Sequence, residues 1–248
     1  MKAFKNKNFL IFAGTSTIAE ALIEKLKIFE VNVIFTSTSE EKAQIIKNKF
    51  GYEYLICDAT DFNQMEEAFK KTKEKLGTID AVANFSGSIL IKAAHQTSYD
   101  EYLSVIHKNL TSCFAITKVA PKYMDNGGSV LFISSIAAQI GIANHEAIAA
   151  AKGGIDALVR SAACTYATKN IRFNAVAPSL TASNLSKNLT SNETMLKASQ
   201  AMHALGRIGK VEDIARACSF LLNPDNSWIT GQIITVDGGF LLKNKVKI

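Results

Sequence analysis

Short apolar runs alternate with longer amphipathic segments along almost the whole chain. The runs cover residues 9–13, 31–35, 54–57, 81–83, 130–133, 171–176 and 233–236. The amphipathic segments cover residues 18–29, 40–49, 61–76, 99–124, 145–168 and 211–222. Because the runs are apolar throughout, they are typical of strands that are covered on both faces of a parallel sheet. The alternation of strands and helices predicts βαβ units with right-handed crossovers.

The same pattern continues through the 248 residues without a Pro-, Gly- or Ser-rich linker and without an internal repeat. We therefore expect a single doubly wound, Rossmann-type α/β domain over residues 1–248. It should have a mostly parallel seven-stranded sheet with helices on both faces. Ligands of such sheets bind beyond the carboxyl ends of the strands. Functional residues should accordingly follow the apolar runs.

Charge and cysteine content exclude several classes of protein. The net charge is +6, but only four of the 28 basic residues are Arg, and the lysines are scattered as on a solvated surface. Nucleic-acid binding is therefore not expected. The four cysteines form no C-x-x-C pair, and no cluster has metal-ligand spacing, so we expect a reducing compartment and no metal site. No apolar run is long enough to span a membrane. We expect a cytoplasmic protein, and the Lys-rich composition favours an AT-rich, bacterial genome.

The turn after the first apolar run begins at Gly14 and continues through Ser16, Thr17 and Ile18. A strand, a tight turn and a helix N-terminus together favour a pyrophosphate group. Dinucleotide-binding turns usually have three glycines, whereas here only Gly14 is present and Ala19 is left to serve helix packing. These four residues are candidate cofactor contacts, and an ordinary βα turn rich in capping residues is the alternative.

Several short motifs follow one another in the rest of the chain. They are DAVANFSG (80–87), KNL (108–110), ISSIA (133–137), NAVAPS (174–179), GRIG (206–209), EDIA (212–215), ITGQ (229–232) and VDGG (236–239). Through these motifs the chain resembles the short-chain dehydrogenase/reductase family. Within that family it is most similar to the 3-oxoacyl-carrier-protein reductase-like branch. Phe85 replaces the second Asn of the family's N-N-A-G segment, and Ser179 replaces the Gly of its N-x-V-x-P-G turn. The resemblance is close from residue 80 to 240 and looser before it.

The resemblance implies an NAD(P)-dependent oxidoreductase that moves a hydride between a nicotinamide and a small carbonyl or alcohol substrate. In this family a Ser positions the substrate oxygen, and a Tyr transfers the proton. A Lys holds the nicotinamide ribose and lowers the Tyr pKa, and an Asn extends the proton relay. Ser135, Lys152 and Asn109 occupy three of these four positions. A phenol needs such a neighbouring cation to act as a base near neutral pH.

The fourth position, four residues before Lys152, is Ile148 rather than Tyr. Isoleucine transfers no proton, and loss of a positioned general acid costs about 10²–10⁴ in rate. His145, about one helical turn earlier, is the candidate substitute acid because imidazole titrates near neutral pH. Alternatively, His145 faces solvent or a neighbouring subunit at the helix N-terminus. The alternative function is a catalytically silent protein on the same fold, with or without a dinucleotide.

The second apolar run ends in Thr36 and Ser37 without an Asp or Glu. A carboxylate there would bind the ribose hydroxyls of NAD and repel a 2′-phosphate. Its absence favours NADP over NAD, although no Arg is present to bind the phosphate.

The resemblance implies further cofactor contacts after other strands. Asp58, with Ala59, matches the position that meets the adenine ring, or else is a helix N-cap. Ser183 falls where a family Thr contacts the nicotinamide amide, or else is a loop serine. The complete implied set after the third, fourth and sixth runs is Asp58, Ala59, Asn84, Ser86, Gly87, Pro178 and Ser183.

Residues 181–203 are polar and rich in Ser, Asn and Thr. The resemblance implies that they are the variable substrate lid, and a flexible surface loop is the alternative. Segments 99–124 and 145–168 form the usual dimer face of the family, which implies a homodimer or homotetramer. His107 and His203 are interpreted as ordinary surface or packed residues.

Overall fold

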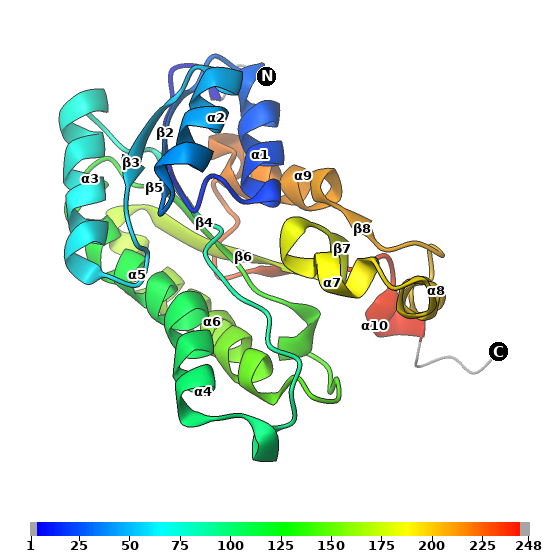
Figure 1. The fold of residues 1–248 in the computed structure, drawn as a ribbon. Coiled ribbons are helices and arrows are strands. Elements are labelled where there is room, and N and C mark those ends of the chain that lie inside the picture. Colours follow the sequence, from blue (N-terminus) through cyan, green and yellow to red (C-terminus); the bar gives the residue numbers. More distant parts are fainter. Residues whose placement is uncertain (1–3, 244–248) are drawn as a thin grey trace.

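The computed structural model describes residues 4–243, and a parallel sheet of seven strands lies at its centre (Figure 1). The strand order is β3-β2-β1-β4-β5-β6-β9, and every neighbouring pair is parallel. The strands are β1 (Asn8–Phe12), β2 (Asn32–Ser37), β3 (Glu53–Ile56), β4 (Ala81–Asn84), β5 (Gly128–Ile133), β6 (Ile171–Pro178) and β9 (Ile233–Val236). The doubly wound Rossmann-type fold expected from the sequence is confirmed.

Helices cover both faces of the sheet. One face packs against α1 (Thr17–Lys27), α2 (Glu40–Phe50) and α9 (Val211–Leu222). The other face packs against α3 (Phe62–Leu76), α5 (Ser112–Tyr123) and α6 (Glu146–Thr165). Along β1, Phe9 and Ile11 face the first layer, and Leu10 and Phe12 face the second. Burial on both faces explains why the strands read as unbroken apolar runs.

Side-chain caps set the starts of the helices that follow the strands. Ser16 caps α1, Ser39 caps α2 and Asp61 caps α3, each by accepting a backbone N–H of the first turn. Ser98 begins α4 (Tyr99–Ile106) with a capping box completed by Glu101. Such caps satisfy N–H groups that have no partner inside the helix.

The segment expected as one helix over 99–124 contains a π-helical turn, η3 (His107–Thr111), between α4 and α5. The backbone stays helical on both sides of it. Within this turn, Asn109 is fully buried and its Nδ2 donates to the carbonyl oxygen of Val105 at 2.9 Å. π-turns are often found at functional sites, and this one carries a residue of the candidate relay.

The region interpreted as a lid or a flexible loop has secondary structure of its own (Figure 1). It contains β7 (Thr181–Ala182), η6 (Asn184–Ser186), α7 (Lys187–Thr190) and α8 (Glu193–Met202), and β7 pairs with β8 (Gly209–Lys210). The chain then ends its described part in α10 (Phe240–Lys243). The remaining short helices are η2 (Ala94–Gln96), η4 (Ile136–Ala138), η5 (Ala167–Lys169) and η7 (Pro224–Asn226). Between residues 4 and 243, none of the helices has the length and apolarity needed to cross a membrane.

Candidate active site

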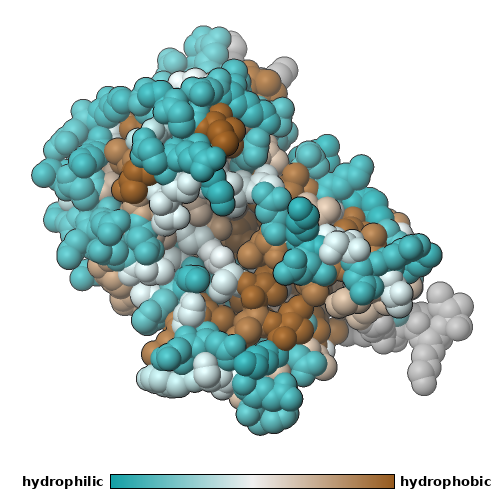
Figure 2. All heavy atoms as spheres, in the orientation of Figure 1, coloured by the Kyte–Doolittle hydropathy of each residue, from teal (hydrophilic) through white to brown (hydrophobic). Residues whose placement is uncertain are grey.

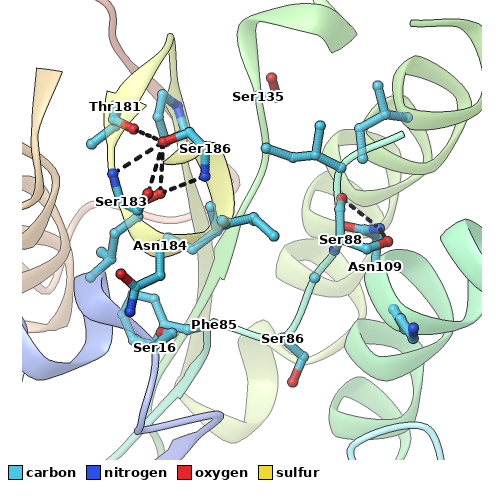
Figure 3. A pocket seen from close by; sticks show the side chains of 18 of the residues that line it. Ser16, Phe85, Ser86, Ser88, Asn109, Ser135, Thr181, Ser183, Asn184 and Ser186 are labelled. Atoms are coloured by element: carbon cyan, nitrogen blue, oxygen red, sulfur yellow. Dashed lines mark hydrogen bonds between the residues drawn. The ribbon is translucent and has the colours of Figure 1, made fainter. Parts of the chain in front are cut away.

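A cavity of about 930 Å³ lies beyond the carboxyl ends of the strands. It begins at the turn after β1, passes the ends of β4 and β5, and reaches the lid segment after β6. Figure 3 shows Ser183 and Ser186 of the lid on one side and Ser88 and Asn109 on the other. Since the neighbours of β1 are β2 and β4, the cavity opens at the switch point of the sheet, where α/β folds bind ligands.

The turn after β1 is tight, and Gly14 serves its packing rather than the cavity. Ala13 has a positive φ of 52°, and the N–H of Gly14 donates to the carbonyl oxygen of Thr36 at 2.8 Å. A Cβ on Gly14 would lie 2.5 Å from the Cβ of Phe35, so only glycine fits. The next four residues do line the cavity, namely Thr15, which the sequence analysis did not single out, and Ser16, Thr17 and Ile18.

Three residues expected to contact the cofactor lie behind the cavity wall, namely Gly14, Thr36 and Asn84. The buried Thr36 side chain accepts the N–H of Ala13 at 3.2 Å. Asn84 donates to Ser112 Oγ at 3.0 Å, and its Oδ1 accepts the N–H of Ser86 at 3.0 Å. These three positions therefore face away from the cavity in this structure, and contact of a cofactor with them stays a prediction. Their hydrogen bonds shape the loops that do line the cavity.

The end of the cavity near β2 and β3 is rich in hydroxyl groups. Ser37, Thr38, Asp58 and Thr60 line it together with Lys42 from the first turn of α2. Asp58 Oδ1 accepts both the N–H and the hydroxyl of Thr60, each at 2.8 Å. The cap of α3 is Asp61, so the helix-cap alternative for Asp58 is wrong.

Ser135 and Lys152 bring β5 and α6 together at the middle of the cavity. Ser135 follows β5 and caps η4, where its Oγ accepts the N–H of Ala137 at 3.1 Å. The buried Lys152 reaches from α6, and its Nζ donates to the carbonyl oxygen of Ile133 at 2.7 Å. Burial lowers the pKa of Lys152 from 10.5 to about 8. The ammonium is thus present at neutral pH but gives up its proton easily.

Asn109 and Lys152 both lie close to Gly87. A Cβ on Gly87 would lie 2.9 Å from Asn109 Oδ1 and 3.7 Å from Lys152 Nζ. The Nδ2 of Asn109 donates to Ser88 Oγ at 3.2 Å, the bond drawn in Figure 3. Because Gly87 has no side chain, the segment after β4 can pass close to both Asn109 and Lys152. Polar groups of the segment after β4, of η3 and of α6 therefore meet at this point.

Ile148 lies one turn of α6 before Lys152 and also lines the cavity. It is buried in a small cluster with Val105, Ala137 and Ala151. No tyrosine lines the cavity in the part of the chain that the structure describes. The middle of the cavity therefore has a lysine, a serine and an asparagine around an aliphatic side chain.

His145 occupies the N-cap position of α6 and lines the cavity as well. Its Nδ1 lies 2.7 Å from the carbonyl oxygen of Ala143. Only an N–H can bond to a carbonyl oxygen, so Nδ1 carries a proton and Nε2 is the nitrogen free for exchange. The histidine thus lies both at the helix start and at the cavity, and its catalytic role stays a prediction.

A buried pair behind the cavity was not anticipated from the sequence. Ser134 Oγ donates to Asp156 Oδ1, and both side chains are buried. Burial raises the pKa of the Asp156 carboxyl, although the Ser134 bond and the charges of Arg160 and Lys152 oppose this. Because Ser134 precedes Ser135 and Asp156 lies one turn after Lys152, the bond ties β5 to α6 beside the two candidate catalytic residues.

Comparison with known proteins places the chain in a family. The family model described as Enoyl-(Acyl carrier protein) reductase matches residues 12–241. A tropinone reductase homolog of Arabidopsis thaliana is 32% identical over 242 residues, covering 94% of this chain and 92% of that protein. The structure of a short-chain type dehydrogenase/reductase from Mycobacterium ulcerans superposes with a TM-score of 0.91 at 26% identity, covering 97% and 91% of the two chains. The chain belongs to the short-chain dehydrogenase/reductase family.

This membership confirms the family and the oxidoreductase class expected from the sequence. A further solved structure that this chain resembles is that of ElxO, as a Tyr-to-Phe variant with NADPH bound. It is 28% identical with a TM-score of 0.90, and the match covers 95% of this chain and 99% of that one. NADP(H) binding is therefore present among structural neighbours of this chain.

Most of the family-implied residues converge on the cavity. Those that line it are Ser16, Thr17, Ile18, Ser37, Asp58, Ala59, Ser86, Gly87, Asn109, Ser135, His145, Lys152, Pro178 and Ser183. Sequence reasoning missed Lys42, Cys57, Ser88 and the apolar lid side chains. Cys57 ends the third apolar run and directly follows β3, so it could have been included on that ground. Burial raises its pKa to about 12. Lys42 lies within the next helix, where no motif marks it.

Proposed function

We propose that the chain binds NADP(H) in this cavity and moves a hydride between the nicotinamide and the carbonyl or alcohol carbon of a small molecule. The observation that carries the proposal is the continuity of the cavity. It joins the turn after β1, the Ser135, Lys152 and Asn109 group, and the lid. One buried polar atom in the wall is available to bond to such an occupant. Among residues 4–243, Ser86 Oγ is buried at the wall without a hydrogen-bond partner.

The preference for NADP over NAD is supported by the residues after β2. Ser37 Oγ donates to the carbonyl oxygen of Ser39 at 2.9 Å and lies 3.4 Å from Thr15 Oγ1. No carboxylate stands at the end of this strand, and Lys42 supplies a positive charge at the same part of the wall. A 2′-phosphate would meet hydroxyls and an ammonium there. The NADPH-bound ElxO variant agrees with this choice.

Each residue around the middle of the cavity has a proposed role. When bound, the nicotinamide supplies or accepts the hydride. Ser135 holds the substrate oxygen, and Lys152 binds the ribose while its positive charge stabilises negative charge on that oxygen. Asn109, fixed by Ser88 and Val105, supports the proton relay. The wider cofactor-binding set is Ser16, Thr17, Ile18, Ser37, Asp58, Ala59, Ser86, Gly87, Pro178 and Ser183.

The proton donor is proposed to be His145, because Ile148 has no exchangeable proton. The bond from Nδ1 to Ala143 fixes the ring and leaves Nε2 for proton transfer. Substitution of His145 by Ala should then lower turnover by about 10²-fold or more without weakening NADPH binding. Unchanged turnover in that variant would exclude the role.

Calorimetric titration with NADPH and NADH, run beside a turnover screen of carbonyl compounds, tests the function as a whole. We expect NADPH binding that is tighter than NADH binding, together with slow turnover. Failure to bind either dinucleotide at millimolar concentration contradicts the proposal. Binding without turnover favours the second candidate, a silent dinucleotide-binding protein, for which the aliphatic Ile148 in the cavity is the supporting observation.

We further propose that residues 1–248 act as one NAD(P)-binding domain with 181–203 as its lid, in a homodimer or homotetramer. The supporting feature is a shallow apolar hollow on α5 and α6, lined by Leu110, Phe114, Gly154 and Leu158 among others. Phe114 is 53% exposed there. Light scattering coupled to gel filtration tests the assembly, and Phe114→Glu should dissociate it.

A bacterial source and a cytoplasmic location remain part of the proposal.

A further inference from the structure

The wall of the cavity beyond Ser135 is made of hydrophobic side chains from several segments. Five isoleucines follow β4, follow β5 or lie on α6, namely Ile89, Ile91, Ile136, Ile142 and Ile148. Figure 2 shows hydrophobic surface gathered in this hollow, between the lid and the segment after β5. A surface of branched aliphatic groups offers dispersion contacts and no hydrogen bonds.

The lid adds apolar side chains that are poorly covered by the protein itself. Leu185 is 56% exposed, Met195 46% and Met202 40%, and all three line the cavity. The rest of the lid is polar and rich in Ser, Asn and Thr. Exposed apolar groups that gather at a cavity mark a binding surface for apolar matter.

The ionisable side chains of the cavity lie elsewhere or are already engaged. Lys42 and Asp58 belong to the end near β2 and β3, and Lys152 Nζ donates to Ile133. Lys108 is exposed on η3, where an ion pair gains little. The remaining two are His145, the proposed proton donor, and Cys57, which lies after β3. Within the described residues, no Asp, Glu or Arg lines the lid end of the cavity.

We infer that the substrate is a neutral, largely apolar ketone or aldehyde, or the matching alcohol, whose hydrocarbon part lies between the isoleucine wall and the lid. This inference rests on the proposed function, which supplies the reaction at Ser135. A substrate carboxylate, phosphate or sugar would lose its hydration against the aliphatic side chains. The lid also carries hydroxyl groups, but those of Ser183 and Ser186 bond to each other and that of Thr181 bonds to the carbonyl oxygen of Ser179. An alkyl chain gains affinity with each methylene group that it buries.

Calorimetry with secondary alcohols on the NADPH-saturated protein tests this without turnover, because both reactants are then reduced. In the series 2-butanol, 2-hexanol and 2-octanol, affinity should rise roughly threefold per added methylene. The anion 3-hydroxyoctanoate should bind at least ~10-fold more weakly than 2-octanol, and sorbitol should not bind. A flat chain-length series, or tighter binding of the anion or of sorbitol, overturns the inference.

Matched variants locate the binding surface. Ile91→Asp and Met195→Asp place a charge on partly exposed positions of the wall and the lid, which favours correct folding. Each should weaken 2-octanol binding by at least ~10-fold. The control is Ile28→Asp, at a position 72% exposed after α1 and outside the cavity lining. Equal losses in all three variants contradict an apolar site at the lid.

The same titrations separate failure of this inference from failure of the proposed function. The alcohol series is repeated on the protein without NADPH, and NADPH affinity is measured on its own. Chain-length dependence without any NADPH binding supports the apolar site and refutes the proposed cofactor. NADPH binding with a flat alcohol series refutes the apolar substrate and leaves the cofactor proposal standing.

Discussion

The two ends of the cavity are built in different ways. At the end near β2 and β3, polar side chains bond to one another and to the backbone of the strand ends, as Ser37 does to Ser39 and Asp58 does to Thr60. At the lid end, the wall is aliphatic, and its outer part is carried by α7 and α8 after β6. At the first end, the positions of the polar side chains are fixed by the ends of the sheet strands. At the second end, the outer wall depends on the lid segment. A scaffold of this kind can keep its cofactor and change its substrate by changing the lid.

The largest effect on turnover should come from restoring a phenol at position 148, where the two ends of the cavity meet. In a protein that also carries His145→Ala, Ile148→Tyr should raise turnover of an accepted ketone by about 10²–10⁴, because it supplies a positioned proton donor one turn from Lys152. The measurement is loss of NADPH absorbance at saturating substrate. Ile148→Phe is the matched control, since it adds the ring without the hydroxyl and should give no gain. A tyrosine variant that binds NADPH without gaining activity contradicts the proposed site.

The second effect concerns the cost of the buried ammonium. Burial lowers the pKa of Lys152 from 10.5 to about 8. Below pH 8 the ammonium is charged in both the folded and the unfolded state, and its burial lowers the free energy of unfolding by the full amount. Above about pH 10.5 the amine is neutral in both states, and this loss of stability is gone. Lys152→Met should therefore stabilise the protein by about 3 kcal/mol at pH 7. This gain should shrink as the pH rises from 8 to 10. Urea unfolding at pH 7, 9 and 10 measures it, and NADPH affinity should fall in the same variant.

If Lys152→Met destabilises the protein at every pH, the hydrogen bond from Lys152 Nζ to the carbonyl oxygen of Ile133 outweighs the cost of burying the charge. Lys122→Met is the matched control. The pKa of the Lys122 ammonium is raised, chiefly by its hydrogen bond to Glu66 at the surface. We therefore expect no stabilisation when the Lys122 ammonium is removed.

The third effect tests whether the Ser134–Asp156 pair positions the catalytic segments. Asp156→Leu leaves the buried Ser134 hydroxyl only the carbonyl oxygen of Lys152, at 3.5 Å, as an acceptor and should cost about 1–3 kcal/mol. Asp156→Asn keeps an acceptor and should restore most of that loss. Because burial raises the Asp156 pKa, this group stabilises the fold most below about pH 4 and loses its contribution as the pH rises through the raised pKa. Urea unfolding at pH 4.5, 5.5 and 7 should show a flatter profile for Asp156→Asn than for the unaltered protein.

The smallest effect concerns the choice of dinucleotide. Lys42→Gln removes the one lysine that lines the cavity on α2 and should weaken NADPH binding about 5- to 10-fold while leaving NADH binding unchanged. Fluorescence titration with both dinucleotides measures the ratio. Lys27→Gln, on the exposed end of α1, is the control. Equal weakening of NADPH and NADH by Lys42→Gln would show that the lysine does not read the 2′-phosphate.

The sequence predicted the fold well because burial on both faces of a parallel sheet leaves an unmistakable pattern. All seven apolar runs correspond to strands of the central sheet. Side-chain direction at the strand ends was harder to predict. Thr36 and Asn84 turn into the protein, whereas their neighbours Ser37 and Phe85 line the cavity. Successive residues of a strand point to opposite faces, and a motif alone does not say which face is which.

Contacts between distant segments account for the rest of what was missed. Asp156 meets Ser134 across 22 positions of sequence, and neither residue belongs to a motif that pairs them. The lid helices were hidden because the segment is polar and has no amphipathic stripe long enough to signal a helix. The confirmed family explains Ser135, Asn109 and Lys152 as a group, while the roles of these residues remain predictions.

His203, the last residue of the lid, joins α8 to the end of β6 and to α10. Its buried ring contacts Ser199 of α8 through Nδ1 at 2.6 Å and Ser179 after β6 through Nε2 at 2.8 Å, with the edge of Phe240 against it. It is thus a packed residue, as the sequence suggested. With both nitrogens engaged, the imidazole is held in one tautomer. Its two nitrogen resonances therefore form a natural spectroscopic gauge of how the last residue of the lid is seated against Ser179 and Phe240.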